Sequence, residues 1–388
     1  MGKSVYVEVN PEVFKWLRES SGWTIEEVAK RLRTSVKVII EIEEGRRAPT
    51  LRQLKELSSA FKVPLAAFLL PEPRKEKWPK DYRLIPGKEG KFDKKTIVAI
   101  RRARSLQEAA RELLYNIGEN PEPRITLANL KDDPEVLAIK YRELFGLSIE
   151  RQIKFDNPYA LFNYLRRQLE SINVFVFQAS MPIEDARGFA LTDDYPAVIV
   201  VNSQDIIQAR LFTLMHEFAH ILLGESVIDR PDILFPAPIY VEKWCNEFAS
   251  SFLLPKKYAE REFNAYRTSL TDFKVIRRLS NKYKVSKQML LYNMTKYGYL
   301  SKKDYEKILN SYRQQDKTKQ KESCEEKDEE DEGGGPPPDK KIMAELGNRF
   351  ISIVMENYYR DNITYPEALD FLSTKTKTFE KLLLQVSR

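Results

Sequence analysis

Residues 206–223 have the sequence IIQARLFTLMHEFAHILL, an apolar stretch that carries both histidines of the chain, His216 and His220. Most of its side chains are apolar, so the pattern predicts a buried helix that ends at Gly224. Positions i and i+4 of a helix lie one turn apart on the same face. Two imidazoles and the carboxylate of Glu217 are costly to bury unless they are paired or bind a metal ion. The stretch therefore predicts a metal site on a buried helix.

The order of residues 216–220, His-Glu-x-x-His, suits a catalytic zinc ion. His216 and His220 would each supply a nitrogen at about 2.0–2.1 Å, and Mn²⁺ fits such a donor set as well. Glu217 is turned by about 100° from His216 around the helix, so it borders the ion without ligating it. That is the position of a general base. If both histidines were ordinary core residues, the lack of any other histidine would stay unexplained.

A catalytic zinc ion needs a third protein ligand, which here must be a carboxylate or a thiolate because the chain has only two histidines. Glu225 and Asp229 follow closely, but they lie in the exit from the helix. The spacing favours Glu242, at the head of a second helix expected over residues 242–254. Its main rival is Glu247, on a different face, and Cys245 is a weaker one, since a buried cysteine is usually a core residue.

Two further roles near the metal follow from the same helices. Asn246 lies four residues after Glu242 on the same face, and it is expected to hydrogen-bond the outer nitrogen of a ligating histidine. The oxyanion of a peptide-cleavage intermediate also needs a donor, which cannot be a third histidine. Tyr240 and Arg230 are candidates by their nearness in sequence alone.

Around this core, the patterns predict an α+β, predominantly helical fold. Residues 172–177, 189–191 and 197–201 are rich in β-branched and aromatic side chains, which favours strands of a small sheet. Residues 11–70 predict five short helices, one of which begins with a capping box of Thr24 and Glu27.

The N-terminal helices 25–32 and 36–44 are spaced as a helix-turn-helix unit. The exposed face of the second helix would present Val36, Lys37, Ile40 and Glu41, of which only Lys37 is a usual reader of base edges. Three arginines are candidates for phosphate contacts: Arg46, Arg47 and Arg52. The alternative use of such a module is contact with protein.

Composition divides the chain into five parts. They are a helix-turn-helix domain (1–73), a linker and helical connector (74–130), a metal-binding domain with a helical C-terminal part (131–312), a disordered acidic Gly/Pro linker (313–341) and a small helical appendix (342–388). The chain has 388 residues, 42% of them hydrophobic, and a formal net charge of +7, which permits contact with nucleic acid. With two cysteines, no signal peptide and no membrane-spanning run, a cytoplasmic protein is expected.

Two blocks resemble the ImmA/IrrE metallopeptidase family: Arg210–His220 (RLFTLMHEFAH) and Glu242–Pro255 (EKWCNEFASSFLLP). Gly188-Phe189 and the segment 199–202 are also similar to that family, and the resemblance covers roughly 132–299. It implies a zincin-like fold with Glu242 as the third ligand. Phe218-Ala219 departs from the family, which often has glycine before the second histidine. Residues 43–50 resemble the end of a lambda-repressor-like (XRE-type) unit, a resemblance that covers about 11–70.

These features predict a zinc-dependent endopeptidase fused to a helix-turn-helix domain. The resemblance implies a protein substrate, often a helix-turn-helix repressor, whose cleavage releases genes in stress or mobile-element control. The alternatives are a non-enzymatic transcriptional regulator with a structural or sensing metal site, and an antitoxin-like interaction protein.

Overall fold

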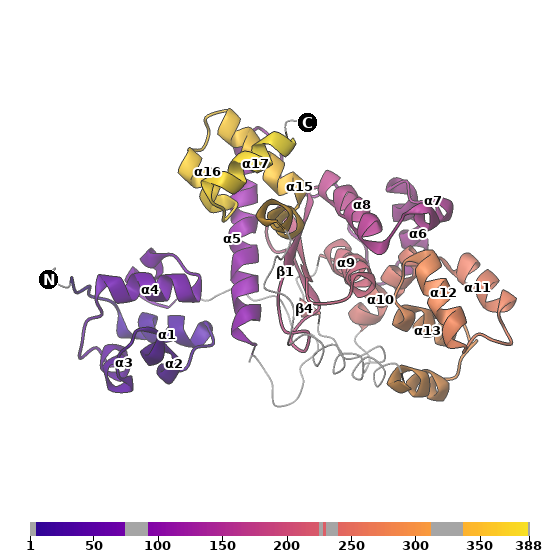
Figure 1. The fold of residues 1–388 in the computed structure, drawn as a ribbon, viewed down its shortest axis with the longest axis horizontal. Coiled ribbons are helices and arrows are strands. Elements are labelled where there is room, and N and C mark those ends of the chain that lie inside the picture. The colour runs from indigo at the N-terminus through magenta and orange to yellow at the C-terminus, as the bar shows by residue number, and fades with distance from the viewer. Residues whose placement is uncertain (1–4, 74–91, 225–227, 230–239, 312–336, 387–388) are drawn as a thin grey trace, which may run out of the picture.

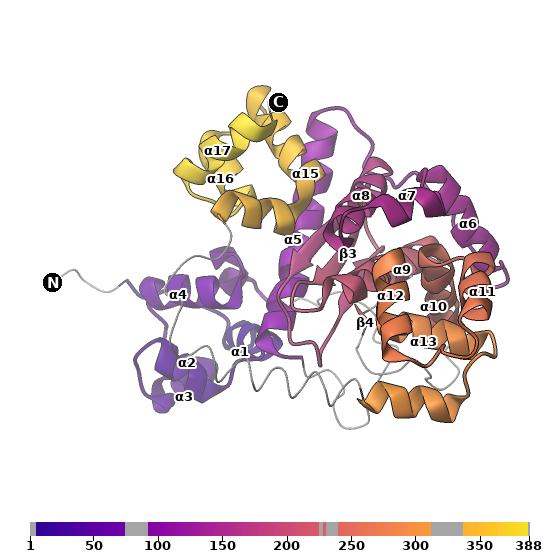
Figure 2. The same ribbon diagram turned by 45° about the vertical axis from the view of Figure 1, so that its right-hand side comes forward.

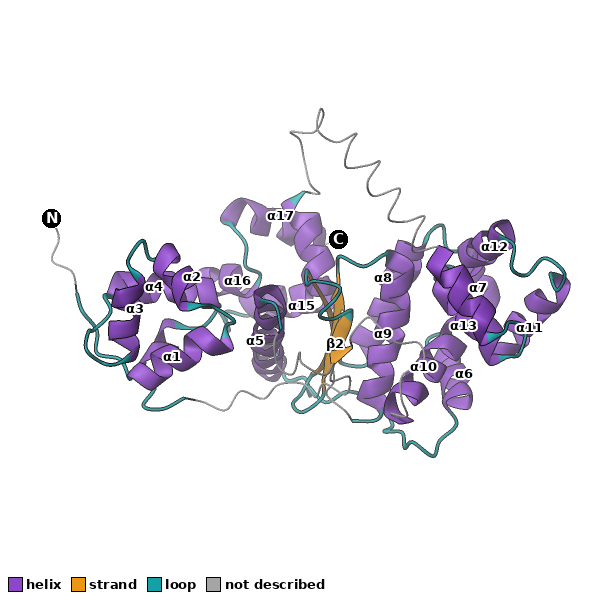
Figure 3. Cartoon of the chain, turned by 90° about the horizontal axis from the view of Figure 1, so that it is seen from below, coloured by secondary structure: helices purple, strands orange, loops and turns teal. Residues whose placement is uncertain are grey.

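The computed structural model describes residues 5–73, 92–224, 228–229, 240–311 and 337–386 of the chain. Helices dominate these residues, and the strands gather in one small sheet near the middle of the molecule (Figures 1 and 3). The α+β, predominantly helical fold class is therefore confirmed. None of the helices in these ranges is both long enough and apolar enough to cross a membrane.

The N-terminal part consists of four α-helices and one short 3-10 helix around a common apolar core. They are α1 (Pro11–Ser20), α2 (Ile25–Arg31), α3 (Val36–Glu43), α4 (Leu51–Phe61) and η1 (Leu65–Leu69). The predicted capping box of Thr24 and Glu27 begins α2, and Thr50 and Gln53 form another at α4. The fifth of the five expected helices is the 3-10 helix. It lies between Pro64 and Pro71, which confine it to a short segment.

The sheet has the strand order β1-β3-β2-β4. Its strands are β1 (Val174–Ala179), β2 (Gly188–Leu191), β3 (Ala197–Asn202) and β4 (Ile228–Asp229). Strand β3 runs parallel to β1 and antiparallel to β2, which is in turn antiparallel to β4. The first strand begins two residues later than predicted, because Asn173 adopts a positive φ of 61° after the preceding helix. Every residue of β2 and β3 is buried, so helices must cover both faces of the sheet.

The helices on one face build the surroundings of the histidines (Figure 2). Helices α8 (Pro158–Ser171) and α9 (Ile207–Leu222) pack next to the sheet, and α10 (Tyr240–Leu253) packs between α9 and α6 (Pro134–Leu144). The remaining helices on this side are α7 (Ile149–Lys154), α11 (Lys256–Ala265), α12 (Phe273–Tyr283), α13 (Lys287–Lys296) and a helix over residues 302–311.

The other face of the sheet is covered by segments from the two ends of the chain. Helix α5 (Lys94–Asn116) and the C-terminal helices α15 (Pro338–Tyr359), α16 (Tyr365–Phe371) and α17 (Thr376–Val386) share one apolar core with it. The segments expected to be a connector and an appendix thus contact the sheet directly, which helical periodicity does not predict. Residues 313–336 of the expected linker lie outside the described residues. Its last residues, 338–341, belong to α15, because Pro338 occupies the first turn of that helix.

A buried ion pair joins α15 to this arrangement. The guanidinium of Arg166 in α8 lies 3.0 Å from Glu170 Oε1 and donates to the carbonyl of Ala344 at 2.7 Å and to that of Val176. Both side chains are about 95% buried. Helix α15 is interrupted at this point by Gly347, which has φ 78° and ψ 160°. The interruption makes carbonyl groups of α15 available to the arginine.

Candidate metal centre

Helix α9 places the two histidines in the interior. Its residues from Thr213 to Leu222 are all buried, and His216, Glu217 and His220 are each at most 1% exposed. The ring of Phe212 stacks on that of His216, with centroids 6.1 Å apart. The predicted buried helix is confirmed, and it ends before Gly224, whose φ is 71°.

Helix α10 brings Glu242 against this pair. Glu242 lies in its first turn and is 1% exposed. The other end of the helix is held by two buried polar side chains. Arg142 donates to the carbonyl of Phe252 at 2.5 Å, and Gln152 donates to that of Leu253 at 2.8 Å. These bonds satisfy carbonyls that a helix end leaves unpaired, and so they anchor the helix that carries the carboxylate.

Three potential ligand atoms converge at one point. The Nε2 atoms of His216 and His220 are 3.1 Å apart, and each lies 3.3 Å from a carboxylate oxygen of Glu242. Tetrahedral ligands at about 2.1 Å from a zinc ion stand about 3.4 Å from one another. The observed separations fit that geometry closely. Two nitrogens and one carboxylate also match the donor set of catalytic zinc sites, which keep a further position open.

The electrostatics of Glu242 fit the same role. Burial raises the pKa of its carboxyl group, but hydrogen bonds and charge interactions with His216 and His220 outweigh burial and lower it overall. The carboxyl group therefore stays ionised at neutral pH, as a metal ligand must.

The outer nitrogens of the two rings have different surroundings. Nδ1 of His220 lies 3.5 Å from the sulfur of Cys245. Nδ1 of His216 has no hydrogen-bond partner within the described part of the chain. Asn246 is buried on α10, but the ranges described show no hydrogen bond from it to either histidine, so its expected supporting role stays a prediction. Sequence spacing missed the contact of Cys245, although its position three residues after Glu242 on the same helix was a usable signal.

The other candidates from the sequence lie apart from this point or outside the described residues. The charge of Glu247 acts on Tyr292 of α13, whose pKa is raised to about 12 by burial first and by this carboxylate second. Asp229 belongs to the edge strand β4, where it pairs with Gly188. Tyr240 is 75% exposed at the start of α10. Glu225 and Arg230 lie outside the described residues.

Strand β2 approaches α9 closely where Glu217 emerges. A Cβ atom on Gly188 would lie 2.5 Å from Thr213 Cγ2, 2.8 Å from the carbonyl oxygen of Val200 and 3.4 Å from Glu217 Cγ. Only glycine permits this distance between strand and helix. The close approach fixes the depth at which the Glu217 side chain lies against the sheet, and no periodicity in the sequence shows it.

The exposed face of the helix-turn-helix unit carries apolar as well as charged side chains, as the sequence predicts. Val36 and Ile40 of α3 are 37% and 36% exposed. The guanidinium of Arg46 pairs with Glu44, and that of Arg47 lies 3.7 Å from Glu41. The two remaining candidates, Lys37 and Arg52, are both exposed. Two of the three arginines expected to contact phosphates are thus neutralised in part by neighbouring glutamates.

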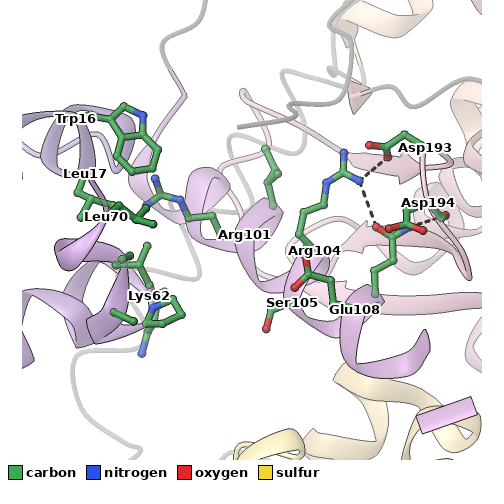
Figure 4. Close-up of a pocket in the computed structure, with 16 residues that line it drawn as sticks. Trp16, Leu17, Lys62, Leu70, Arg101, Arg104, Ser105, Glu108, Asp193 and Asp194 are labelled. Carbon is green, nitrogen blue, oxygen red and sulfur yellow. Dashed lines mark hydrogen bonds and ion pairs between the residues drawn. The ribbon is translucent and has the colours of Figure 1, made fainter. Parts of the chain in front are cut away.

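A cavity of about 700 Å³ lies where the N-terminal helices meet α5 (Figure 4). Trp16 and Leu70 contribute to its apolar wall, and the opposite wall carries the ion pair of Arg104 with Asp193. The metal-ligand candidates do not line it, so this cavity is separate from the metal centre.

Comparison with known families assigns both parts of the chain. Residues 169–295 match the model of the IrrE N-terminal-like domain of the M78 peptidases, and residues 14–68 match a helix-turn-helix model. The chain joins a helix-turn-helix domain to an IrrE-like domain. Both assignments made from the sequence are thereby confirmed. No curated protein matched the chain.

The IrrE-like domain contains the complete candidate metal centre. The matched segment begins near the end of α8 and ends in α13, so it includes all four strands and the helices α9 and α10. The match to a model of the M78 peptidases agrees with a metal ion at this site, and the donor atoms described above fit one. The helices α5 and α15, which cover the second face of the sheet, lie outside the matched segment.

Proposed function

We propose that the chain is a zinc-dependent endopeptidase, with His216, His220 and Glu242 as the metal ligands. The observation that carries the proposal is the convergence of two imidazole nitrogens and one carboxylate at separations of 3.1–3.3 Å. Their location in an IrrE-like domain of the M78 peptidases supports it. Mn²⁺ fits the same donors and is the alternative metal.

Glu217 is the proposed general base. It is fully buried and directly follows a ligand, but it is not one of the three converging donors. A bound zinc ion would acidify a water molecule and polarise the scissile carbonyl. A carboxylate oxygen of Glu217 would accept the proton of the attacking water and then deliver it to the leaving amine. The apolar surroundings supplied by α9 favour this proton transfer by excluding other water.

The proposed substrate is a partner protein, specifically a helix-turn-helix repressor in stress or mobile-element regulation. The resemblance to the ImmA/IrrE family supports this choice. The fused helix-turn-helix domain is consistent with it, because such a domain would bring the peptidase to the DNA that a repressor occupies. In that domain Arg46, Arg47 and Arg52 are the proposed phosphate contacts, and Lys37 is the proposed reader of base edges.

The variant Glu217→Gln tests the peptidase proposal. Glutamine keeps the size of the side chain but cannot accept the proton, so the variant should retain its metal and lose cleavage by roughly 10²- to 10⁴-fold. The measurement is cleavage of co-expressed repressors from neighbouring genes, with metal content determined by elemental analysis. His216→Ala is the control that should lose both the metal and the cleavage.

The second candidate is a regulator that uses the ion for structure or sensing. The exposed Val36 and Ile40 on α3 favour contact of the helix-turn-helix domain with protein, which such a regulator would need. This regulator requires the ligands but not a base, so it should tolerate Glu217→Gln. Regulatory output that survives in Glu217→Gln and is lost in His216→Ala would replace the peptidase proposal with this one.

A further inference from the structure

Positive charge is concentrated in one part of the chain. Residues 256–311 contain fourteen Lys and Arg against five Asp and Glu, a net charge of +9, which exceeds the +7 of the whole chain. Residues 1–73, which include the helix-turn-helix domain, contain twelve Lys and Arg against ten Asp and Glu, a net charge of +2. The strongest electrostatic attraction for an anion therefore belongs to the helices α11 to α13 and the helix that follows them.

Helix α12 presents these charges as a stripe. Lys274, Arg277, Arg278 and Asn281 are exposed at i, i+3, i+4 and i+7, and hence on one face. The opposite face buries Ile276, Leu279, Ser280 and Tyr283. From residue 274 to residue 282 the stripe extends for about 12 Å at a rise of about 1.5 Å per residue. Within the ranges that the structure covers, Lys274, Arg277 and Arg278 form no ion pair.

Residues of α11 and of the turn that follows it extend this stripe of cations beyond α12. Lys282 lies 2.7 Å and Arg261 3.6 Å from the same oxygen of Glu262, a residue that is 8% exposed. Arg278 lies over the ring of Tyr266, 5.9 Å from its centroid. We call the resulting patch the basic surface, and it consists of Arg261, Lys274, Arg277, Arg278 and Lys282.

The composition of the basic surface indicates the class of its partner. Stable protein interfaces have an apolar centre that is depleted in charged residues. The large apolar side chain exposed on α12 is Phe273, at 38%, and the ammonium group of Lys287 lies 4.7 Å above its ring. A row of cations without an apolar centre suits a polyanion, whose phosphates require charge and no apolar burial.

We propose that the basic surface binds the phosphate backbone of double-stranded DNA without regard to sequence. Each DNA strand carries one phosphate per about 3.4 Å of helix axis, so a stripe of about 12 Å faces about three phosphates. The chain already holds a helix-turn-helix domain, but that domain has little net charge, and its Arg46 and Arg47 are paired with glutamates. The basic surface lies at the opposite end of the molecule (Figure 1), where it supplies a second contact with DNA.

The test uses the full-length chain and a fluorescent duplex of random sequence. The triple variant Lys274→Gln, Arg277→Gln, Arg278→Gln should bind at least about 10-fold more weakly at physiological salt. Affinity falls with salt by a slope of about 0.9 per phosphate contact, so losing three contacts should reduce the slope of log K against log salt by two to three. The variant Lys274→Arg keeps the positive charge, so it should bind DNA as the unmodified chain does. Circular dichroism and metal content should not change, because the three substituted side chains are exposed and lie on a different helix from the metal ligands.

A matched control removes the same charge elsewhere, with Lys131→Gln, Lys140→Gln and Arg167→Gln, three exposed positions outside the basic surface. The control should bind DNA within about twofold of the unmodified chain, because net charge alone has a weak effect at physiological salt. Equal losses in both triple variants would overturn the proposal, as would unchanged DNA binding by the α12 variant. Polyglutamate is the probe for an acidic protein partner. An α12 variant that loses polyglutamate binding and keeps DNA binding would also refute the proposal.

Discussion

Glu242 and Glu247 lie five residues apart on α10, and their side chains have opposite environments. Glu242 faces two imidazoles, whereas the charge of Glu247 acts on Tyr292 of α13. We therefore expect Glu242→Ala to lose most of the bound zinc and Glu247→Ala to keep about one equivalent per chain. Elemental analysis of the purified variants checks this. If Glu247→Ala lost the metal and Glu242→Ala kept it, the third ligand would be Glu247, on the other face of the helix.

A second prediction at the residue scale concerns Cys245, which lies next to a ring nitrogen of His220. Its sulfur lies 3.5 Å from Nδ1 of His220, and a thiol forms only weak hydrogen bonds. Replacing it with serine keeps a hydrogen-bonding atom at this place, so Cys245→Ser should retain metal within about tenfold, while Cys245→Ala should weaken metal binding on the order of 10- to 100-fold. Competition with a chelator of known affinity measures both. Equal affinities for the two variants would show that the contact does not support His220.

At the scale of elements, the contact between β2 and α9 depends on one glycine. In Gly188→Ala the new methyl group would meet Thr213 Cγ2 at 2.5 Å, so α9 must move away from the sheet. Overpacking of this kind costs about 1–3 kcal/mol of stability and should displace Glu217. Cleavage should fall more than metal binding, because Glu217 Cγ is one of the three nearest atoms to the added methyl group, at 3.4 Å, and no histidine atom is among them. The measurements are the rate of cleavage and the metal content.

A second substitution distinguishes this contact from a general loss of folding. Thr213→Ser removes the Cγ2 atom that the new methyl group would meet, while the carbonyl of Val200 stays at 2.8 Å. The double variant Gly188→Ala, Thr213→Ser should therefore recover part of the lost cleavage, and Thr213→Ser alone should stay close to the unmodified protein. No recovery in the double variant would argue against the contact with Thr213.

At the scale of the whole molecule, Gly347 decides how the C-terminal helices attach. A Cβ atom there would lie 2.5 Å from one nitrogen of the Arg166 guanidinium and 2.6 Å from another, in a backbone conformation with φ 78° that other residues rarely adopt. Gly347→Ala should lower the free energy of unfolding by more than about 2 kcal/mol, because it disturbs a buried ion pair and strains the backbone. Chemical denaturation measures the change. Gly298→Ala is a useful comparison, since its φ is also positive but nothing lies within 4 Å of the added atom.

The helix-turn-helix domain contacts α5, one of the helices that cover the second face of the sheet. Arg101 donates to Ser21 Oγ at 2.5 Å, to Ser20 Oγ at 2.8 Å and to the carbonyl of Phe61 at 3.2 Å. Arg101→Ala should free the helix-turn-helix domain from α5 and increase the radius of gyration in small-angle scattering. Metal content should not change, because the metal centre is built from α9 and α10. An unchanged scattering profile would show that other contacts suffice to hold the domain.

Local patterns in the amino-acid sequence were enough to predict the helices and the type of site. The capping box of Thr24, the apolar stretch that surrounds His216 and the alternation of strands with turns are short-range features, so they can be recognised without knowing the fold. The helix-turn-helix and IrrE-like assignments rest on such motifs as well, and both are confirmed. The choice of Glu242 over Glu247 needed the family resemblance, because spacing alone allows either face of α10.

Contacts between distant segments depend on packing, which no local pattern encodes. The meeting of Glu242 with the two histidines is set by how α10 crosses α9, and the close approach of Gly188 is set by how β2 lies on that helix. The C-terminal helices are joined to the sheet because its second face is apolar and must be buried, although more than a hundred residues separate β3 from α15. Burial of this kind is non-directional, so the sequence shows that a face must be covered, and only the tertiary structure shows by which helices.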